Sequence, residues 1–262
     1  MPPPDISSLI GLIPHRMAFA GGWIDQPFLS ALNPAPPGSM VVINLHPTFP
    51  WMDRAGMASG TRKVALKLWP NGLPPADRID LVKQLYAAEN AGLAEPSGSQ
   101  DMIGLIYPGV SRLDFVATHE GGIFPSHIES NNDPAIARWL ERVIHVLPVA
   151  PRPEGYNPLL QKNLDPDWIR RLGQTGKDCY NAILKKNAAA LGASFNECMA
   201  CWAAILPCTV RHPKITADLP AIQNFYKNRY AGAMYSGCGG GYLYIVSETP
   251  VPGTFSVQVR TA

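Results

Sequence analysis

The order of strand-like and helix-like segments is the feature of this sequence that most restricts its fold. Short apolar runs rich in β-branched residues, at 40–47 and 142–150, predict strands, and residues 230–262 hold a glycine-rich turn between two more strand-like runs. Long helical patterns fill residues 165–192 and 194–206. Strands and helices therefore occur in blocks and do not alternate one by one. This order favours an α+β fold over a doubly wound parallel sheet.

Local signals place further elements. Residues 78–90 carry apolar side chains at helix spacing, and residues 133–143 predict a helix that starts at the N-cap Asp133 with Pro134 in its first turn. Residues 102–124 predict a strand, a turn and a second strand.

Proline clusters divide the chain. The longest covers residues 147–158, and with the change from strand-rich to helix-rich sequence it places a boundary near residues 141–158. We therefore expect two domains, 1–140 and 141–262.

Composition excludes several classes of function. With 46% hydrophobic and 16% charged residues the chain is an ordinary globular protein. Its formal net charge is +2 and it has no basic run, so nucleic acid is not an expected partner. The N-terminal sequence predicts neither a signal peptide nor a membrane span, and five cysteines do not indicate a disulfide framework. We expect a cytoplasmic protein and leave its oligomeric state open.

Three glycine-bearing stretches and one pair of acids stand out. Residues 14–27 run from a strand into Gly21-Gly22 and Asp25, and residues 53–69 pass from a turn of small residues into an amphipathic helix. Small residues at a helix N-terminus let backbone N–H groups bind an anion. A glycine-rich turn follows at 235–246. Taken singly, these stretches are also typical of a strand entering a turn, a capped helix and a hairpin.

The acids are Glu89, at the end of a predicted helix, and Asp101, behind a break at Pro96 and Gly98. Their spacing allows the two carboxylates to converge on one point, as a site for a cation or a proton transfer requires. The alternative is that Glu89 is solvated and Asp101 is an N-cap.

Together and in this order, the stretches resemble the motifs of the GHMP kinase superfamily (galactokinase, homoserine kinase, mevalonate kinase and phosphomevalonate kinase), most closely its heptose-kinase-like and fucose-kinase-like sugar branch. The matching positions are Pro14, Arg16, Gly21, Gly22 and Asp25; Gly56, Met57, Ala58, Ser59, Gly60 and Thr61; Glu89, Gly98, Ser99, Gln100 and Asp101; and Ser236 to Gly241. The chain departs from the family at Gly60 and Arg62. It also has a short region between Gln26 and residues 56–61, the stretch that resembles the family's phosphate loop.

The resemblance implies a two-layer GHMP-kinase-like fold, with a ribosomal-protein-S5-domain-2-like N-terminal half and a ferredoxin-like C-terminal half. It also implies an ATP- and Mg²⁺-dependent kinase acting on a hydroxyl of a sugar or related polyol. The implied roles are as follows: catalysis by Asp101 and Arg16; phosphate binding by Gly56, Ala58, Ser59, Gly60, Thr61, Gly239 and Gly240; Mg²⁺ binding by Ser59 and Glu89; and substrate binding by Asp25, Gly22 and His127.

Two rival functions remain open. The short region before the phosphate loop, together with Gly60, is also compatible with a non-catalytic binding or regulatory protein that keeps the fold. Cys198 and Cys201 have the C-x-x-C spacing of a zinc or thiol-redox site. They lie in an apolar, helix-like segment without a second pair, which favours packing in the core.

A second metal cluster is conceivable around His119, Glu120, His127 and Glu129. Adjacent residues of a strand face opposite sides, so His119 and Glu120 do not suit one metal. This segment is better explained as a loop that contacts substrate, with His127 as the contact.

Overall fold

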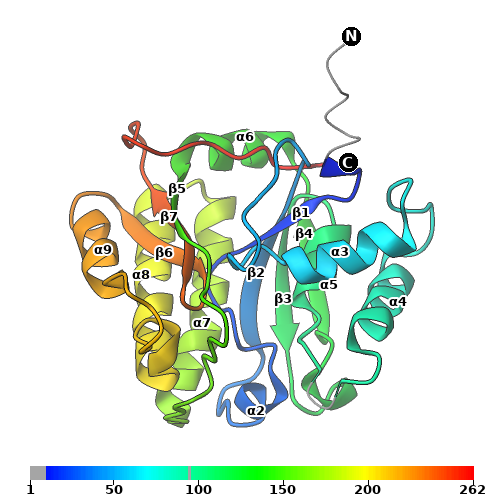
Figure 1. The fold of residues 1–262 in the computed structure, drawn as a ribbon, viewed down its shortest axis with the longest axis horizontal. Coiled ribbons are helices and arrows are strands. Elements are labelled where there is room, and N and C mark those ends of the chain that lie inside the picture. Colours follow the sequence, from blue (N-terminus) through cyan, green and yellow to red (C-terminus); the bar gives the residue numbers. More distant parts are fainter. Residues whose placement is uncertain (1–9, 94–95) are drawn as a thin grey trace.

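The computed structural model describes residues 10–93 and 96–262, and it contains two antiparallel β-sheets with helices packed around them (Figure 1). The first sheet has four strands in the order β1-β2-β3-β4, and the second has three in the order β5-β7-β6. All neighbouring strands are antiparallel. The α+β class predicted from the sequence is therefore confirmed. The strands are β1 (His15–Ala18), β2 (Gly38–Leu45), β3 (Val110–Phe115), β4 (His127–Asn131), β5 (Ile144–Ala150), β6 (Gly232–Gly237) and β7 (Gly240–Val246).

Five of the helices form two groups. The pair α7 and α8 joins the sheets, because α7 packs on β2 and α8 on β6 while the two helices pack on each other (Figure 1). In the other group α3, α4 and α5 contact one another, and α5 packs on β1 and β2. The helices are α2 (Pro27–Ser30), α3 (Ser59–Leu68), α4 (Arg78–Asn90), α5 (Gln100–Ile106), α6 (Pro134–Val143), α7 (Pro166–Leu184), α8 (Ala188–Ile205) and α9 (Leu219–Lys227), with short 3-10 turns at Glu120–Gly122 and Pro207–Thr209.

Most helix boundaries follow local signals. The expected helix over 78–90 is α4, whose first turn is capped by the Asp77 carboxylate. The expected helix after Asp133 is α6: Asp133 accepts a hydrogen bond from the backbone N–H of Ala135, and Pro134 lies in the first turn.

One predicted strand is wrong. The apolar run that begins at Met102 forms α5, and the strand of this region is β3, which starts only at Val110. Residues 102–106 are all buried, since they lie between the first sheet and the neighbouring helices. A short run that is buried all round has no polar face, so its sequence shows neither the helical nor the strand period.

The predicted division at 140/141 remains a prediction. The strands before α6 all belong to the first sheet, and the second sheet begins with β5 at Ile144. However, α7 packs on β2, and Val259 forms a β-bridge with Leu45, so parts of the C-terminal half complete the first sheet.

The cysteines and the hydropathy of the helices agree with a packed interior. All five cysteines are buried and free in the described part of the chain. Among residues 10–93 and 96–262, no helix has the length and apolar character needed to cross a bilayer. Residues 1–9, which the expectation about a signal peptide included, lie outside the described residues.

Candidate functional site

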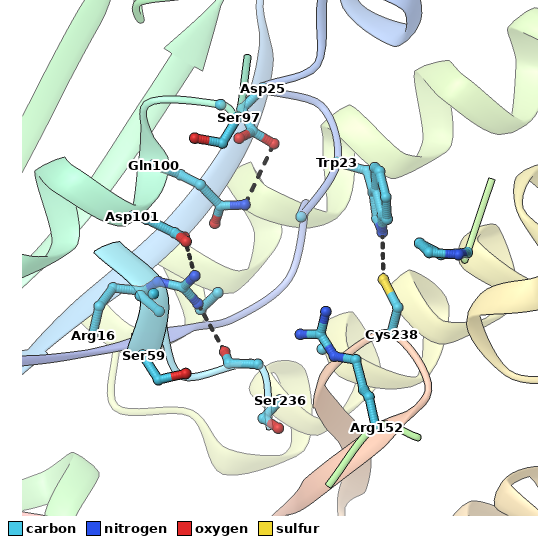
Figure 2. Close-up of a pocket in the computed structure, with 18 of the residues that line it drawn as sticks. Arg16, Trp23, Asp25, Ser59, Ser97, Gln100, Asp101, Arg152, Ser236 and Cys238 are labelled. Atoms are coloured by element: carbon cyan, nitrogen blue, oxygen red, sulfur yellow. Dashed lines mark hydrogen bonds and ion pairs between the residues drawn. The ribbon is translucent and has the colours of Figure 1, made fainter. Parts of the chain in front are cut away.

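A cavity of about 470 Å³ collects residues from both halves of the chain (Figure 2). Its lining comes from β1 and the turn after it, the N-terminus of α3, the end of α4, the start of α5, residues 152–158, α8 and the β6–β7 turn. Its size is typical of a small-molecule site. The sequence-predicted residues that line it are Arg16, Gly22, Asp25, Gly56, Ala58, Ser59, Gly60, Glu89 and Asp101.

Four predicted site residues are not among those that line the cavity. Thr61 is 2% exposed and lies behind it, where its hydroxyl contacts both predicted acids. Gly239 and Gly240 line a smaller neighbouring pocket. His127 is exposed at the start of β4, opposite Asp114.

The two acids converge as predicted. Glu89 comes from the last turn of α4 and Asp101 from the first turn of α5. The Thr61 hydroxyl donates to Glu89 Oε1 at 2.9 Å and lies 3.3 Å from Asp101 Oδ2. Glu89 is not simply solvated, because its Oε2 is buried. Asp101 is not the N-cap of α5, because that position is Ser99.

Arg16 holds Asp101 in place. Its guanidinium, 5% exposed on β1, forms an ion pair with Asp101 and donates to the carbonyl oxygen of Gly56 at 3.1 Å (Figure 2). The same side chain therefore joins β1, α5 and the loop before α3.

Asp25 is the most deeply buried acid of the site. It is 1% exposed, and Gln100 donates to its Oδ1 at 3.5 Å, while Oδ2 has no hydrogen-bond partner among the described residues. Burial raises the pKa of Asp25 to about 7, and the negative charge of Asp101 adds to the shift. The shift favours the protonated form of Asp25, which can both accept and donate a hydrogen bond.

The N-terminus of α3 is open towards the cavity. Its N-cap, Ala58, has a left-handed backbone (φ 54°), and no side chain of the described chain caps the helix. The first backbone N–H groups of a helix lack partners within the helix and attract anions. Ala58, Ser59 and Gly60 all line the cavity, so this helix start can bind a phosphate group.

Gly56 is required where the loop before α3 meets the β6–β7 turn. Its φ is 77°, and a Cβ atom there would lie 2.6 Å from the carbonyl oxygen of Ser236. The two loops, from opposite halves of the chain, thus pack backbone against backbone.

Arg62, which departs from the family pattern, does not enter the cavity. Its side chain turns back and donates to the carbonyl oxygens of Ile10, Ile13 and Pro14. Arg62 therefore ties α3 to residues 10–14 and leaves the loop before α3 open to ligand.

The residues present fit a hydrated magnesium ion better than a metal held by protein alone. In the described chain, no group of three His, Cys, Asp or Glu side chains is placed to hold a metal. Glu89 Oε2 is buried, and no described residue donates to it, while the Ser59 hydroxyl lines the same cavity. One carboxylate and one hydroxyl are typical of Mg²⁺, which keeps several waters and takes further ligands from bound phosphates.

The C-x-x-C pair is packed in the core. Cys198 and Cys201 lie in α8 with no exposed surface, and Cys198 Sγ accepts from the backbone N–H of Gly21 at 3.4 Å. Burial raises the pKa of both thiols, so they are protonated and unreactive at neutral pH.

Sequence reasoning missed several residues of the site. Arg152 and Tyr156 lie in the proline-rich segment 147–158, whose composition indicates only a linker. Arg54 lies in the stretch 53–69, but the sequence assigns it no role. Trp202 lies in α8 and donates from its indole N–H to the carbonyl oxygen of Gly22 at 3.0 Å. Their positions depend on contacts between segments far apart in the sequence.

Known structures share this fold. No protein-family model and no curated protein sequence matches the chain. Among solved structures it is similar to a D-glycero-D-manno-heptose 1-phosphate kinase from Bacteroides thetaiotaomicron (TM-score 0.55, 12% identity, 95% of each chain covered). It is also similar to the mevalonate kinase of Methanococcus jannaschii (0.58, 10%, 90% of this chain and 89% of that one) and to the galactokinase of Lactococcus lactis, solved with galactose (0.54, 10%, 90% and 85%).

These likenesses define the fold of the protein. Two antiparallel sheets in an α+β arrangement match over nearly the whole length of both chains, although identity is only 10–12%. The resemblance to the GHMP kinase superfamily, first suggested by the motifs, is thereby confirmed at the level of the fold. The chain has the fold shared by heptose, mevalonate and galactose kinases.

Proposed function

We propose that this protein is an ATP- and Mg²⁺-dependent kinase that phosphorylates a hydroxyl of a sugar or related polyol. The observation that carries the proposal is the convergence of Glu89 and Asp101, from two different helices, beside the open N-terminus of α3. The fold shared with sugar and mevalonate kinases supports it. Phosphoryl transfer requires alignment of the attacking oxygen and neutralisation of charge, and this site has groups for both.

Each group has a task in this proposal. The backbone N–H groups at 58–60 bind the phosphates of the donor, and Ser59 and Glu89 hold Mg²⁺. The bound Mg²⁺ neutralises phosphate charge. Asp101 accepts the proton of the attacking hydroxyl, while the ion pair with Arg16 holds Asp101 in position. Asp25 and the backbone of Gly22 bind the hydroxyls of the acceptor.

The short connection from β2 to α3 motivates the other candidate. Only residues 46–58 lie between these elements, so little chain is available to enclose a nucleotide base. This feature favours a protein of the same fold that binds a ligand without catalysing a reaction.

Calorimetric titration of ATP, with and without Mg²⁺, separates the two candidates. The kinase proposal expects binding that needs Mg²⁺, and Ser59→Ala weakens it. Asp101→Asn is expected to keep nucleotide binding and to lower turnover by about 10² to 10⁴-fold, the usual contribution of a general base. Asp167→Asn, on an 86% exposed side chain of α7, is the matched control. Absence of nucleotide binding, or full turnover by Asp101→Asn, would contradict the kinase mechanism.

A further inference from the structure

Charge is distributed unevenly around the cavity. Its three acids, Asp25, Glu89 and Asp101, lie on the side formed by α4, α5 and the turn after β1, together with Arg16. The other two charged residues that line it are Arg54 and Arg152. Figure 2 shows Arg152 beside Cys238, across the cavity from Asp101.

Arg152 has no partner for its charge among the described residues. Its backbone N–H donates to the carbonyl oxygen of Arg54 at 2.9 Å, but its guanidinium makes neither a hydrogen bond nor an ion pair with any described residue. Its Nε is buried. Arg152 as a whole is half-buried, but a buried guanidinium nitrogen without an acceptor is costly, and this cost is offset when an anion binds.

The glycine-rich turn packs against the segment that carries this arginine. A Cβ atom at Gly239 would lie 2.8 Å from the Tyr156 ring, and one at Gly237 would lie 2.9 Å from the Cα atom of Gly56 and 3.0 Å from Arg152 Nη2. Tyr156 is itself fixed, since its hydroxyl donates to the carbonyl oxygen of Cys208 at 2.9 Å. Glycine at 239 therefore leaves room for Tyr156, which lies in the same segment as Arg152, and glycine at 237 leaves room for the backbone of Gly56.

Arg54, an exposed residue that is hydrogen-bonded through its backbone to Arg152, has an unusual backbone conformation. Its φ is 56°, in the left-handed region that non-glycine residues seldom adopt, and such strain is concentrated at functional sites. Its guanidinium contacts the carbonyl oxygen of Pro153, which carries no net charge. No carboxylate of the described chain pairs with either arginine.

We infer that Arg54 and Arg152 form a binding site for an anionic group, a carboxylate or a phosphate, carried by the acceptor substrate. This inference rests on the proposed function and specifies its substrate class: an acidic or already phosphorylated polyol in place of a neutral sugar. With the anion on Arg152, the remainder of the acceptor extends across the cavity towards Asp101 and Asp25.

Calorimetric titration of inorganic phosphate at low ionic strength tests the site. The proteins are the wild type, Arg152→Met, Arg152→Lys and the control Arg170→Met, which removes a 48% exposed arginine of α7. Each is titrated alone and with saturating Mg²⁺ and ADP, which fill the donor site. We expect Arg152→Met to weaken phosphate binding at least about tenfold, Arg152→Lys to recover part of the loss, and Arg170→Met to bind as wild type.

The outcomes are distinct. Equal affinity of wild type and Arg152→Met, or no phosphate binding by wild type, overturns the anion site. If ADP displaces the bound phosphate, the two arginines bind the nucleotide donor, and their assignment to the acceptor is overturned. If ADP does not bind at all, the proposed kinase function fails, while the titration without nucleotide still decides the anion site. Arg152 has no side-chain hydrogen bond to a described residue, so we expect Arg152→Met to melt at the same temperature as wild type. An unchanged melting temperature excludes misfolding as the cause of weaker phosphate binding.

Discussion

The buried carboxyl of Asp25 is expected to make the protein less stable as the pH rises. Its pKa is about 7 in the folded chain and about 3.8 when unfolded. Between these values the folded chain keeps a proton that the unfolded chain has released, so the free energy of unfolding decreases with pH over this window. A difference of about 3 units at about 1.4 kcal/mol each corresponds to about 4 kcal/mol.

Urea denaturation of wild type and Asp25→Asn from pH 4 to pH 8 measures this effect. Asparagine cannot ionise, so the difference in unfolding free energy between the two proteins isolates residue 25. His15 acts in the opposite direction, because burial lowers its pKa to about 3, but it is present in both proteins and cancels. We expect wild type to lose about 4 kcal/mol relative to Asp25→Asn, mostly between pH 4 and 7.

The exposed carboxyl of Asp167 supplies the control. Asp167→Asn should stay within about 0.5 kcal/mol of wild type at every pH, as is usual for exposed positions. Parallel curves for wild type and Asp25→Asn would refute the argument, because they would mean that the carboxyl is solvated in the folded protein.

Two further substitutions test the packing around the site. Gly56→Ala places a Cβ 2.6 Å from the Ser236 carbonyl and should lower the free energy of unfolding by at least about 2 kcal/mol more than Gly92→Ala does. Gly92 has a similar φ of 76° and no described atom within 4 Å of the new Cβ, so it is the control. Equal losses of the two variants in urea denaturation would refute the backbone contact. Arg62→Met removes hydrogen bonds to carbonyl oxygens near Ile13 and should cost about 2 to 3 kcal/mol. A melting temperature of Arg62→Met equal to that of wild type would show that these bonds contribute nothing.

The candidate site was partly predictable. The motif order pointed to Arg16, Asp25, Glu89 and Asp101, and all four line one cavity. The resemblance also assigned phosphate binding to Gly239 and Gly240, which line a neighbouring pocket, and that role stays a prediction. A glycine-rich sequence indicates only that small residues are needed. Here Gly237 makes room for the backbone of Gly56, and Gly239 makes room for the Tyr156 ring.

Local sequence determined where most elements begin and end. Asp133 with Pro134 starts α6 through a hydrogen bond between neighbours in the chain, and the blockwise order of strands and helices indicated the α+β class. Such signals act over a few residues, so one sequence is enough to detect them.

Only the tertiary structure decided which side chains meet. Arg16 and Asp101 pair across 85 positions of the chain, and Arg152 reaches the cavity from a proline-rich segment without periodic signal. The burial of residues 102–106 on all sides likewise turned an expected strand into α5. The physical reason is that burial and ion pairing depend on neighbours brought together by packing, and the local pattern of a single segment does not specify them.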